Sequence, residues 1–122
     1  MAKRILVVDD EAELVKAMQI RLQQADYEVL VAYDGQEAME KAKKEKPDLI
    51  ILDLMLPKMD GYKACGLLKS DSRYHKIPII MLTARAQESD EKLGYECGAE
   101  AFITKPFQHE AVLAKVKELL KD

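Results

Sequence analysis

Four short apolar runs of this chain each end in side chains that could take part in chemistry. The first run ends at Asp9 and Asp10, the second at Asp53, the third at Thr83 and the fourth at Lys105. Short apolar runs are typical of strands buried in a sheet. In an open sheet of parallel strands, ligands bind at the edge formed by the carboxyl ends. We therefore expect three acids, a hydroxyl and a lysine to share one site.

The acids Asp9, Asp10 and Asp53 are the candidate metal ligands. If the strands ending at Asp9 and Asp53 are neighbours, three carboxylates meet within a few ångströms and repel one another. A divalent cation relieves this repulsion, and carboxylate oxygens suit Mg²⁺. The alternative is that Asp10 caps the following helix in a capping box with Glu13. That alternative leaves Asp9 without a role, so we favour the metal interpretation.

Phosphoryl transfer is the chemistry that these groups suggest. A carboxylate beside Mg²⁺ can attack phosphorus and form an acyl phosphate, which makes Asp53 the candidate nucleophile. Thr83 and Lys105 would offer a hydroxyl and a cation to the phosphoryl oxygens. Each of them alone would be an ordinary strand-end or surface residue. The bond between Lys105 and Pro106 has two open interpretations, a proline tolerated near a helix start or a cis bond that turns Lys105 into the site.

The composition of the chain excludes several classes of protein. The 122 residues are 48% hydrophobic with a net charge of -3, which fits one folded domain over residues 1–122 with no segment left for an output domain. No apolar stretch approaches the ~18 residues of a membrane span, and no signal peptide precedes the first strand. We therefore expect a cytoplasmic protein without membrane contact. Because the lysines are dispersed, direct nucleic-acid binding is not expected either.

Other sites with familiar sequence patterns are missing from the chain. It has neither of the glycine-rich motifs GxGxxG and GxxxxGK[ST] that bind nucleotides. Cys65 and Cys97 form no CxxC pair and no metal-ligand cluster with His75 or His109. We interpret both cysteines as small residues packed in a reducing cytosol.

Apolar runs alternate with segments of helical periodicity, which predicts an α/β fold. The expected strands are residues 4–9, 28–33, 48–53, 78–83 and 101–104. The expected helices are residues 11–25, 36–45, 61–70, 87–97 and 108–121. The strands show no clean alternation of apolar and polar residues, which is typical of parallel strands buried on both faces. Five βα units with right-handed crossovers form a doubly wound sheet.

The ordered motifs of the chain resemble the response regulator receiver domain of two-component signalling. These motifs are Val-Asp-Asp, Leu-Asp-Leu-Met-Leu-Pro-Lys-Met-Asp-Gly, Met-Leu-Thr-Ala and Thr-Lys-Pro-Phe, and the resemblance runs from Arg4 to about Leu120. It implies a (βα)5 flavodoxin-like fold, with a parallel five-stranded sheet in the order 2-1-3-4-5. It also implies that the bond between Lys105 and Pro106 is cis.

The resemblance assigns a role to each candidate residue. Asp53 matches the phosphoacceptor. Asp9, Asp10 and Asp53, with the backbone carbonyl of Met55, match the ligands of Mg²⁺. Water needs a polar side chain to position it for attack on the acyl phosphate, and the family often uses the positions of Met55 and Arg85. Because Met55 cannot orient water well, we expect slow autodephosphorylation and not the turnover of an ordinary enzyme.

Thr83 and Lys105 match the family's phosphoryl-binding hydroxyl and lysine. Phe102 matches the switch aromatic, which rotates inward when that hydroxyl moves towards the phosphoryl group; the alternative is an ordinary core aromatic. Phosphorylation would thereby change the face formed by the fourth helix, the fifth strand and the fifth helix, and control a downstream protein target or an attached output domain. On this face, Lys92, Glu100 and Lys115 could form a phosphorylation-dependent homodimer.

The first helix carries the expected docking surface for the phosphodonor. Its core stripe is Val15, Met18, Leu22 and Ala25. Ile20 lies nearly opposite this stripe and Leu14 on its flank, and Ala17 allows close approach. The face adjoins the loop of Asp9 and Asp10, so a partner there could reach Asp53. A single exposed apolar residue is the alternative. The resemblance implies a sensor histidine kinase or a histidine phosphotransfer protein as the partner.

Two other functions use similar residues or the same architecture. An aspartyl-phosphate phosphohydrolase acting on small phosphate esters generally has a second acid two residues after its nucleophile, where this chain has Met55. A flavodoxin-like electron carrier needs a hydroxyl- and glycine-rich loop after the first strand, where this chain has Asp-Asp-Glu. Both alternatives therefore fit the motifs less well than a phosphorylation-controlled switch.

Overall fold

A computed structural model of the chain describes residues 2–56, 58–83 and 97–121. The strands are β1 (Arg4–Val8), β2 (Glu28–Ala32), β3 (Leu49–Asp53), β4 (Ile79–Thr83) and β5 (Ala101–Thr104). The helices are α1 (Ala12–Gln24), α2 (Gly35–Glu45), α3 (Gly61–Lys69) and α5 (His109–Leu120). Most bounds differ from the expected ones by a single residue. Of the helix expected at residues 87–97, only Cys97 is described, and it lies in a turn.

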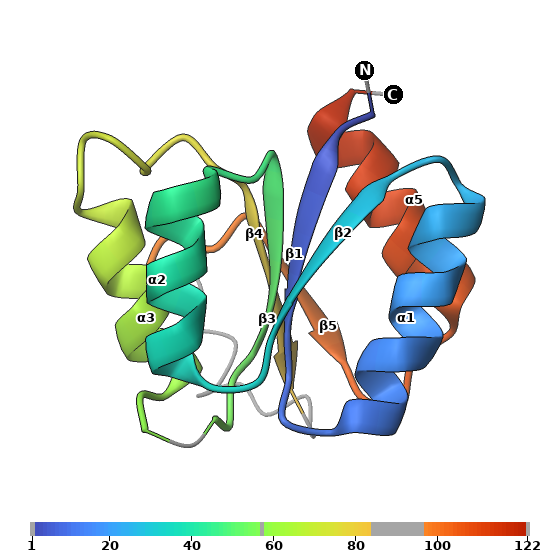
Figure 1. Ribbon diagram of the computed structural model, residues 1–122, viewed down its shortest axis with the longest axis horizontal. Coiled ribbons are helices and arrows are strands. Elements are labelled where there is room, and N and C mark those ends of the chain that lie inside the picture. Colours follow the sequence, from blue (N-terminus) through green and yellow to red (C-terminus); the bar gives the residue numbers. More distant parts are fainter. Residues whose placement is uncertain (1, 57, 84–96, 122) are drawn as a thin grey trace.

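The five strands form one parallel sheet in the order β2-β1-β3-β4-β5, as expected. Helices α1 and α5 cover one face of this sheet and α2 and α3 cover the other, and the two chain ends lie side by side (Figure 1). In the register, Val8 of β1 is opposite Leu52 of β3, and Asp53 is opposite Leu82 of β4. The order therefore places the carboxyl ends of β1 and β3 next to each other.

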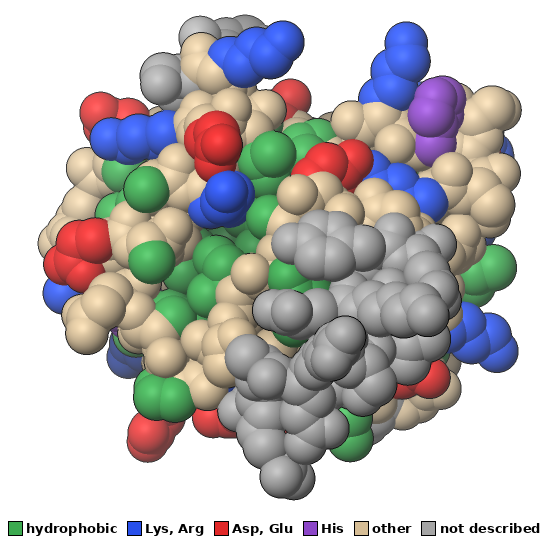
Figure 2. Space-filling view, turned by 180° about the vertical axis from the view of Figure 1, so that it is seen from behind, with side chains coloured by type: hydrophobic (Ala, Val, Ile, Leu, Met, Phe, Trp, Pro, Cys, Tyr) green, Lys and Arg blue, Asp and Glu red, His purple; other side chains and the backbone are tan. Residues whose placement is uncertain are grey.

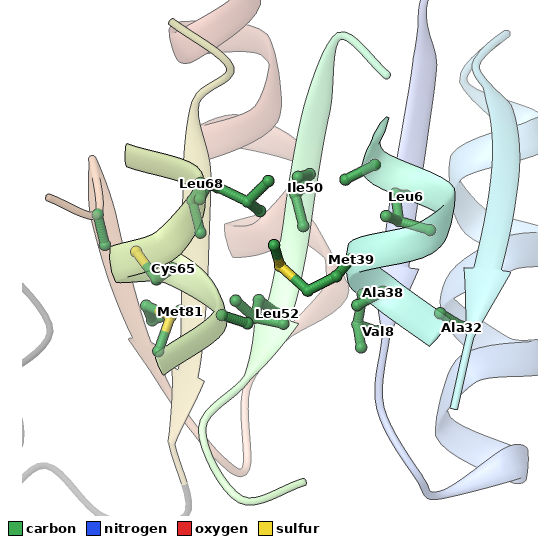
Figure 3. Close-up of a cluster of buried hydrophobic side chains, with 14 of the residues drawn as sticks. Leu6, Val8, Ala32, Ala38, Met39, Ile50, Leu52, Cys65, Leu68 and Met81 are labelled. Atoms are coloured by element: carbon green, nitrogen blue, oxygen red, sulfur yellow. The ribbon is translucent and has the colours of Figure 1, made fainter. Parts of the chain in front are cut away.

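Each central strand sends side chains into two separate cores. Leu6, Ile50 and Met81 pack under α2 and α3 (Figure 3), whereas Ile5 and Ile80 pack under α1 and α5. All residues of β3 and β4 are buried, which explains why their sequences do not alternate. Among the described residues, no helix has the length and apolar composition that a bilayer crossing requires.

Aspartates begin two of the helices at the edge where the strands end. Asp34 caps α2 by accepting from the Glu37 backbone N–H, and Asp60 caps α3 in the same way. Helix α1 differs, because its N-cap is Glu11 and makes no side-chain capping bond. The capping box suggested for Asp10 is therefore wrong, since the helix starts one residue too late for it.

Candidate functional site

The carboxyl edge of the sheet brings the three predicted acids together. Asp9 follows β1 and Asp53 ends β3, and their exposed fractions are only 1% and 5%. Asp10 is exposed at the rim of the same edge. Each of the three residues offers a carboxylate oxygen, and these oxygens lie within 4.8 Å of one another. The Asp9 carboxylate also accepts from the Glu11 backbone N–H at 2.9 Å, which holds the turn between β1 and α1.

Lys105 enters this acidic cluster from the loop after β5. Its Nζ lies 2.8 Å from Oδ2 of Asp9, 3.3 Å from Oε1 of Glu11 and 3.4 Å from Oδ2 of Asp53. Its backbone N–H donates to the carbonyl of Thr83 at 2.5 Å, which fixes the loop against β4. The bond from Lys105 to Pro106 is cis, which confirms the interpretation implied by the resemblance.

Burial and neighbouring charges shift the pKa values of Asp53 and Lys105. The pKa of Asp53 rises to about 6, first because the carboxyl is buried and second because Asp9 repels its charge; Lys105 opposes both effects. Burial acts to lower the pKa of Lys105, but its hydrogen bond to Asp9 and the charges of Asp53 and Asp9 outweigh burial and raise it. Lys105 therefore stays charged, and the ionised form of Asp53 is disfavoured without further positive charge.

The donor set at this edge fits Mg²⁺. Among the described residues, the ammonium of Lys105 contacts three carboxylates, and Asp10 adds a fourth acid close by. Oxygen ligands in an acidic, partly open pocket are what Mg²⁺ takes, since this ion keeps several of its waters. Asp9, Asp10 and Asp53 are the residues that would hold it, and the excess negative charge is what it would offset.

The hydroxyl and the aromatic residue expected in the switch lie on neighbouring strands. Thr83 is buried at the end of β4, directly after Leu82, which is opposite Asp53. Phe102 lies on β5 opposite Met81 and is partly buried against the core under α2 and α3. The fold thus places Thr83 beside the acidic cluster and Phe102 on the next strand.

A surface hollow of about 420 Å³ adjoins the site. It is lined by Glu11, Leu14, Lys105, Pro106, Phe107 and His109. Glu11, Phe107 and His109 had no predicted role, although Glu11 directly follows the acid pair and Phe107 follows the Lys-Pro motif. Phe107 and His109 meet edge to face with ring centres 5.8 Å apart, which forms one wall.

Of the expected docking residues, Leu14 lies in this hollow and Ile20 lies outside it. Ile20 is 46% exposed on α1, as its position opposite the core stripe predicts. Leu14 and Ala17 are partly buried. The core stripe is confirmed for Val15, Met18 and Leu22, which are buried, whereas Ala25 is the C-cap of α1 and only partly buried.

The family model described as "Response regulator receiver domain" matches residues 5–117 of the chain. The chain belongs to this family. The receiver domain is 49% identical over 121 residues to the alkaline phosphatase synthesis transcriptional regulatory protein PhoP of Bacillus subtilis, covering 99% of this chain and 50% of PhoP. It is 44% identical over 118 residues to the DNA-binding dual master transcriptional regulator RpaA of Synechocystis, covering 97% of this chain and 49% of RpaA. This receiver domain thus spans about half the length of the curated relatives it matches.

Solved structures agree with the family. A CheY-like response regulator receiver domain protein from Methanospirillum hungatei has a TM-score of 0.93 and 30% identity, covering 99% of this chain and 95% of its own. The chemotaxis response regulator CheY4 of Vibrio cholerae has a TM-score of 0.92 and 34% identity, covering 98% of this chain and 99% of its own. Receiver domains are signalling switches of two-component systems and generally not classical enzymes, so the phosphohydrolase and electron-carrier alternatives lose their support.

Proposed function

We propose that Asp53 accepts a phosphoryl group from a histidine of a sensor kinase or phosphotransfer protein, in a reaction that needs Mg²⁺. The observation that carries this proposal is the buried Asp53 carboxylate at the sheet edge, which shares the Lys105 ammonium with buried Asp9. In the reaction, an Asp53 oxygen forms a bond to phosphorus while the bond from phosphorus to the histidine nitrogen breaks. The histidine keeps that electron pair, and the phosphoryl group becomes an acyl phosphate.

The surrounding side chains would stabilise the incoming charge. Lys105 would bind a phosphoryl oxygen, because its ammonium already lies 3.4 Å from Asp53. We assign the Thr83 hydroxyl to a second phosphoryl oxygen. Bound Mg²⁺ would supply positive charge that offsets the phosphoryl oxygens and the acids, and the backbone carbonyl of Met55 is our further candidate ligand. Since the pKa of Asp53 is raised, this charge would also favour the ionised nucleophile.

Intact-mass measurement with acetyl phosphate tests the nucleophile and the metal together. Wild type should gain one phosphoryl group only when Mg²⁺ is present, Asp53→Asn should gain none, and Asp10→Ala should bind metal weakly and label poorly. Asp60→Asn is the matched control, since Asp60 lies at the same edge but caps α3, and asparagine caps equally well. Full labelling of Asp53→Asn would refute the assignment.

We propose that the acyl phosphate signals through Thr83 and Phe102. A phosphoryl group brings nearly two negative charges and three acceptor oxygens. Its contacts to Thr83 and Lys105 exist only in the phosphorylated form, so they shift the equilibrium between two arrangements of the loops and of Phe102.

Figure 2 views the molecule from behind and shows hydrophobic side chains gathered among charged ones. This side includes β5 and α5, and we assign to it the control of a downstream protein or an attached output domain.

The phosphoryl mimic beryllofluoride tests this coupling. In wild type, beryllofluoride should shift the NMR signals of Phe102, whereas in Thr83→Ala the shift should be much smaller. Thr83→Ala should still be labelled by acetyl phosphate, because Asp53 and the metal ligands remain. Equal Phe102 shifts in both proteins would contradict the coupling through this hydroxyl.

We propose that the phosphodonor docks on α1 through Leu14, Ala17 and Ile20. The hollow beside Lys105 supports this, because Leu14 lines it and a partner seated there would stand next to the acidic cluster. Ile20 adds an apolar side chain that is 46% exposed.

We further assign residues 1–122 to one cytoplasmic receiver domain, as is usual for its family.

A matched pair of variants tests the docking face. Ile20→Glu should sharply slow transfer from a histidine kinase that phosphorylates wild type, while labelling by acetyl phosphate stays unchanged. Leu67→Glu is the control, because Leu67 is 44% exposed on α3, on the opposite face of the sheet. Equal kinase rates for Ile20→Glu and Leu67→Glu, with both folds confirmed by circular dichroism, would rule this face out.

A further inference from the structure

The two cysteines of the chain meet although they are far apart in sequence. Cys65 lies on α3 and is fully buried in the core that Figure 3 shows. Cys97 lies in the turn before β5 and packs against the same core, partly exposed. The Sγ of Cys65 is 3.6 Å from the carbonyl oxygen of Cys97. The fold thus brings the chain's only two thiol residues to one place.

The thiols themselves also interact. The pKa of the Cys65 thiol is strongly raised, first because it is buried and second because the Cys97 thiol is its hydrogen-bonding neighbour. Cys65 therefore stays protonated and shielded from oxidants in solution. Cys97 is the member of the pair that solvent can reach. This asymmetry separates an attacking thiol from a resolving one.

We infer that Cys65 and Cys97 form a peroxide-sensitive dithiol that closes to an intramolecular disulfide. The Cys97 sulfur attacks hydrogen peroxide and the oxygen–oxygen bond breaks. Cys97 becomes a sulfenic acid, and its thiol proton leaves with the displaced hydroxide as water. The Cys65 sulfur then attacks the sulfenic sulfur, and the Cys65 proton leaves with the displaced hydroxide as water. Two thiols and one peroxide thus give one disulfide and two waters, and a reducing dithiol reverses the bond.

The disulfide would tie α3 to the turn that leads into β5. The segment enclosed between the two cysteines contains β4 and therefore Thr83. Phe102 lies just beyond the turn and packs against the same core as Cys97. Closing this loop restricts the unfolded chain, so the oxidised protein should resist denaturant better than the reduced one. This inference is independent of Asp53 and of phosphorylation.

Mass spectrometry of the wild-type chain tests the inference directly. After treatment with hydrogen peroxide, the monomer should lose the mass of two hydrogens and resist alkylation by N-ethylmaleimide. Non-reducing digestion should yield one linked peptide that contains both cysteines, and dithiothreitol should restore two alkylation sites. The urea midpoint of unfolding should be higher in the oxidised sample.

Two variants provide the control. Cys65→Ala removes the resolving thiol, so Cys97 should instead gain oxygen; Cys97→Ala should leave Cys65 reduced, because it is buried. In wild type, oxygen adducts on Cys97 beside a free Cys65 would overturn the proposal. Disulfide-linked dimers in place of the intramolecular bond would overturn it as well. Both outcomes are read on the wild-type chain and do not depend on the folding of either variant.

Discussion

Asp53 is buried beside a second buried acid, so the fold itself places two carboxylates where their charges repel. Asp53 is 5% exposed and lies beside Asp9, which is 1% exposed. The pKa of about 6, against an ordinary value of 3.8, corresponds to a cost of roughly 3 kcal/mol for the ionised form in the folded protein. The arrangement makes sense if the site is built to receive positive charge and a phosphoryl group.

Removing this charge should therefore stabilise the protein in the absence of metal. The folded pKa of Asp53 lies above the unfolded one, so the unfolded chain loses its proton first as pH rises. The stability that Asp53 contributes is complete below pH 3.8 and is lost as pH rises through about 6. In EDTA at about pH 7.5, Asp53→Asn should be more stable than wild type by on the order of 1–3 kcal/mol in urea unfolding.

The stability difference between Asp53→Asn and wild type should shrink at about pH 4.5, where the folded wild type is largely protonated at Asp53. Added Mg²⁺ should also narrow this stability difference. Only the wild type keeps all three carboxylate ligands, so Mg²⁺ should stabilise it more than the variant. An Asn variant that is less stable than wild type in EDTA at neutral pH would contradict the strain assigned to Asp53.

Met55 should set the lifetime of the acyl phosphate. Its side chain is 71% exposed, and its backbone N–H donates to Asp53 at 3.3 Å, so it lies beside the acceptor. A thioether cannot orient water as an amide can, so Met55→Asn should lose phosphate several-fold faster in a single-turnover assay. Met55→Leu is the control and should match wild type. A rate for the Asn variant no higher than that of Met55→Leu would count against this role; Arg85 lies outside the described residues.

At the scale of elements, the turn from β3 into α3 holds the acceptor in place. Gly61 begins α3, and its N–H donates to the carbonyl of Leu54 at 2.9 Å. A Cβ at position 61 would lie 2.4 Å from the carbonyl oxygen of Asp53 and 2.9 Å from the Cα of Leu54. The helix start is thus packed directly on the backbone of the phosphoacceptor.

Gly61→Ala should push the Asp53 backbone out of position. We expect a loss of stability of about 1–3 kcal/mol from the overpacking, together with weaker Mg²⁺ binding and slower acetyl phosphate labelling. Gly66→Ala on the same helix is the matched control, because nothing lies within 4 Å of a Cβ there. It should be neutral or stabilising by up to about 1 kcal/mol, since alanine favours helix. If the two variants label equally fast, the packing argument fails.

The acidic cluster could be predicted from the sequence, whereas the exact start of the first helix and the roles of Glu11 and Phe107 could not. The strand runs ending at Asp9 and Asp53 were informative because parallel strands share one carboxyl edge, so the acidic cluster followed from sheet order alone. The capping box at Asp10 failed because cap position depends on one residue of backbone geometry, which the pattern Asp-x-x-Glu does not settle. Glu11 and Phe107 were missed because the start of α1 and the loop after β5 are distant in sequence and line one hollow only in the fold.

At the scale of the whole molecule, two residues expected in the homodimer contact, Glu100 and Lys115, already form ion pairs within the chain. Glu100 already binds Lys69 at 2.6 Å and the Ile79 backbone N–H at 2.8 Å. Lys115 pairs with Glu118 on its own helix at 2.7 Å, and Lys92 lies outside the described residues. The exposed pair of Lys115 and Glu118 contributes little and can exchange partners. Glu100 is held more firmly, because the Lys69 side chain is only 11% exposed, so a dimer would have to recruit both side chains from existing contacts.

Sedimentation velocity tests whether activation produces that dimer. We expect monomer alone and a dimer after addition of Mg²⁺ and beryllofluoride. Reversing one charge in Lys115→Glu should weaken the dimer without affecting acetyl phosphate labelling, because Lys115 lies on α5 and not at the acidic cluster. Monomer under both conditions would remove the homodimer from the proposed function.

The central claim is that Asp53 alone carries the phosphoryl group, and trapping the acyl phosphate tests it most directly. Borohydride reduces an aspartyl phosphate to homoserine, which peptide sequencing by mass spectrometry places at a single position. After labelling with acetyl phosphate and Mg²⁺, homoserine should appear at position 53 and at neither Asp9 nor Asp10. Homoserine at either of those neighbours, or a phosphoryl group on His75 or His109 with position 53 unchanged, would contradict the account.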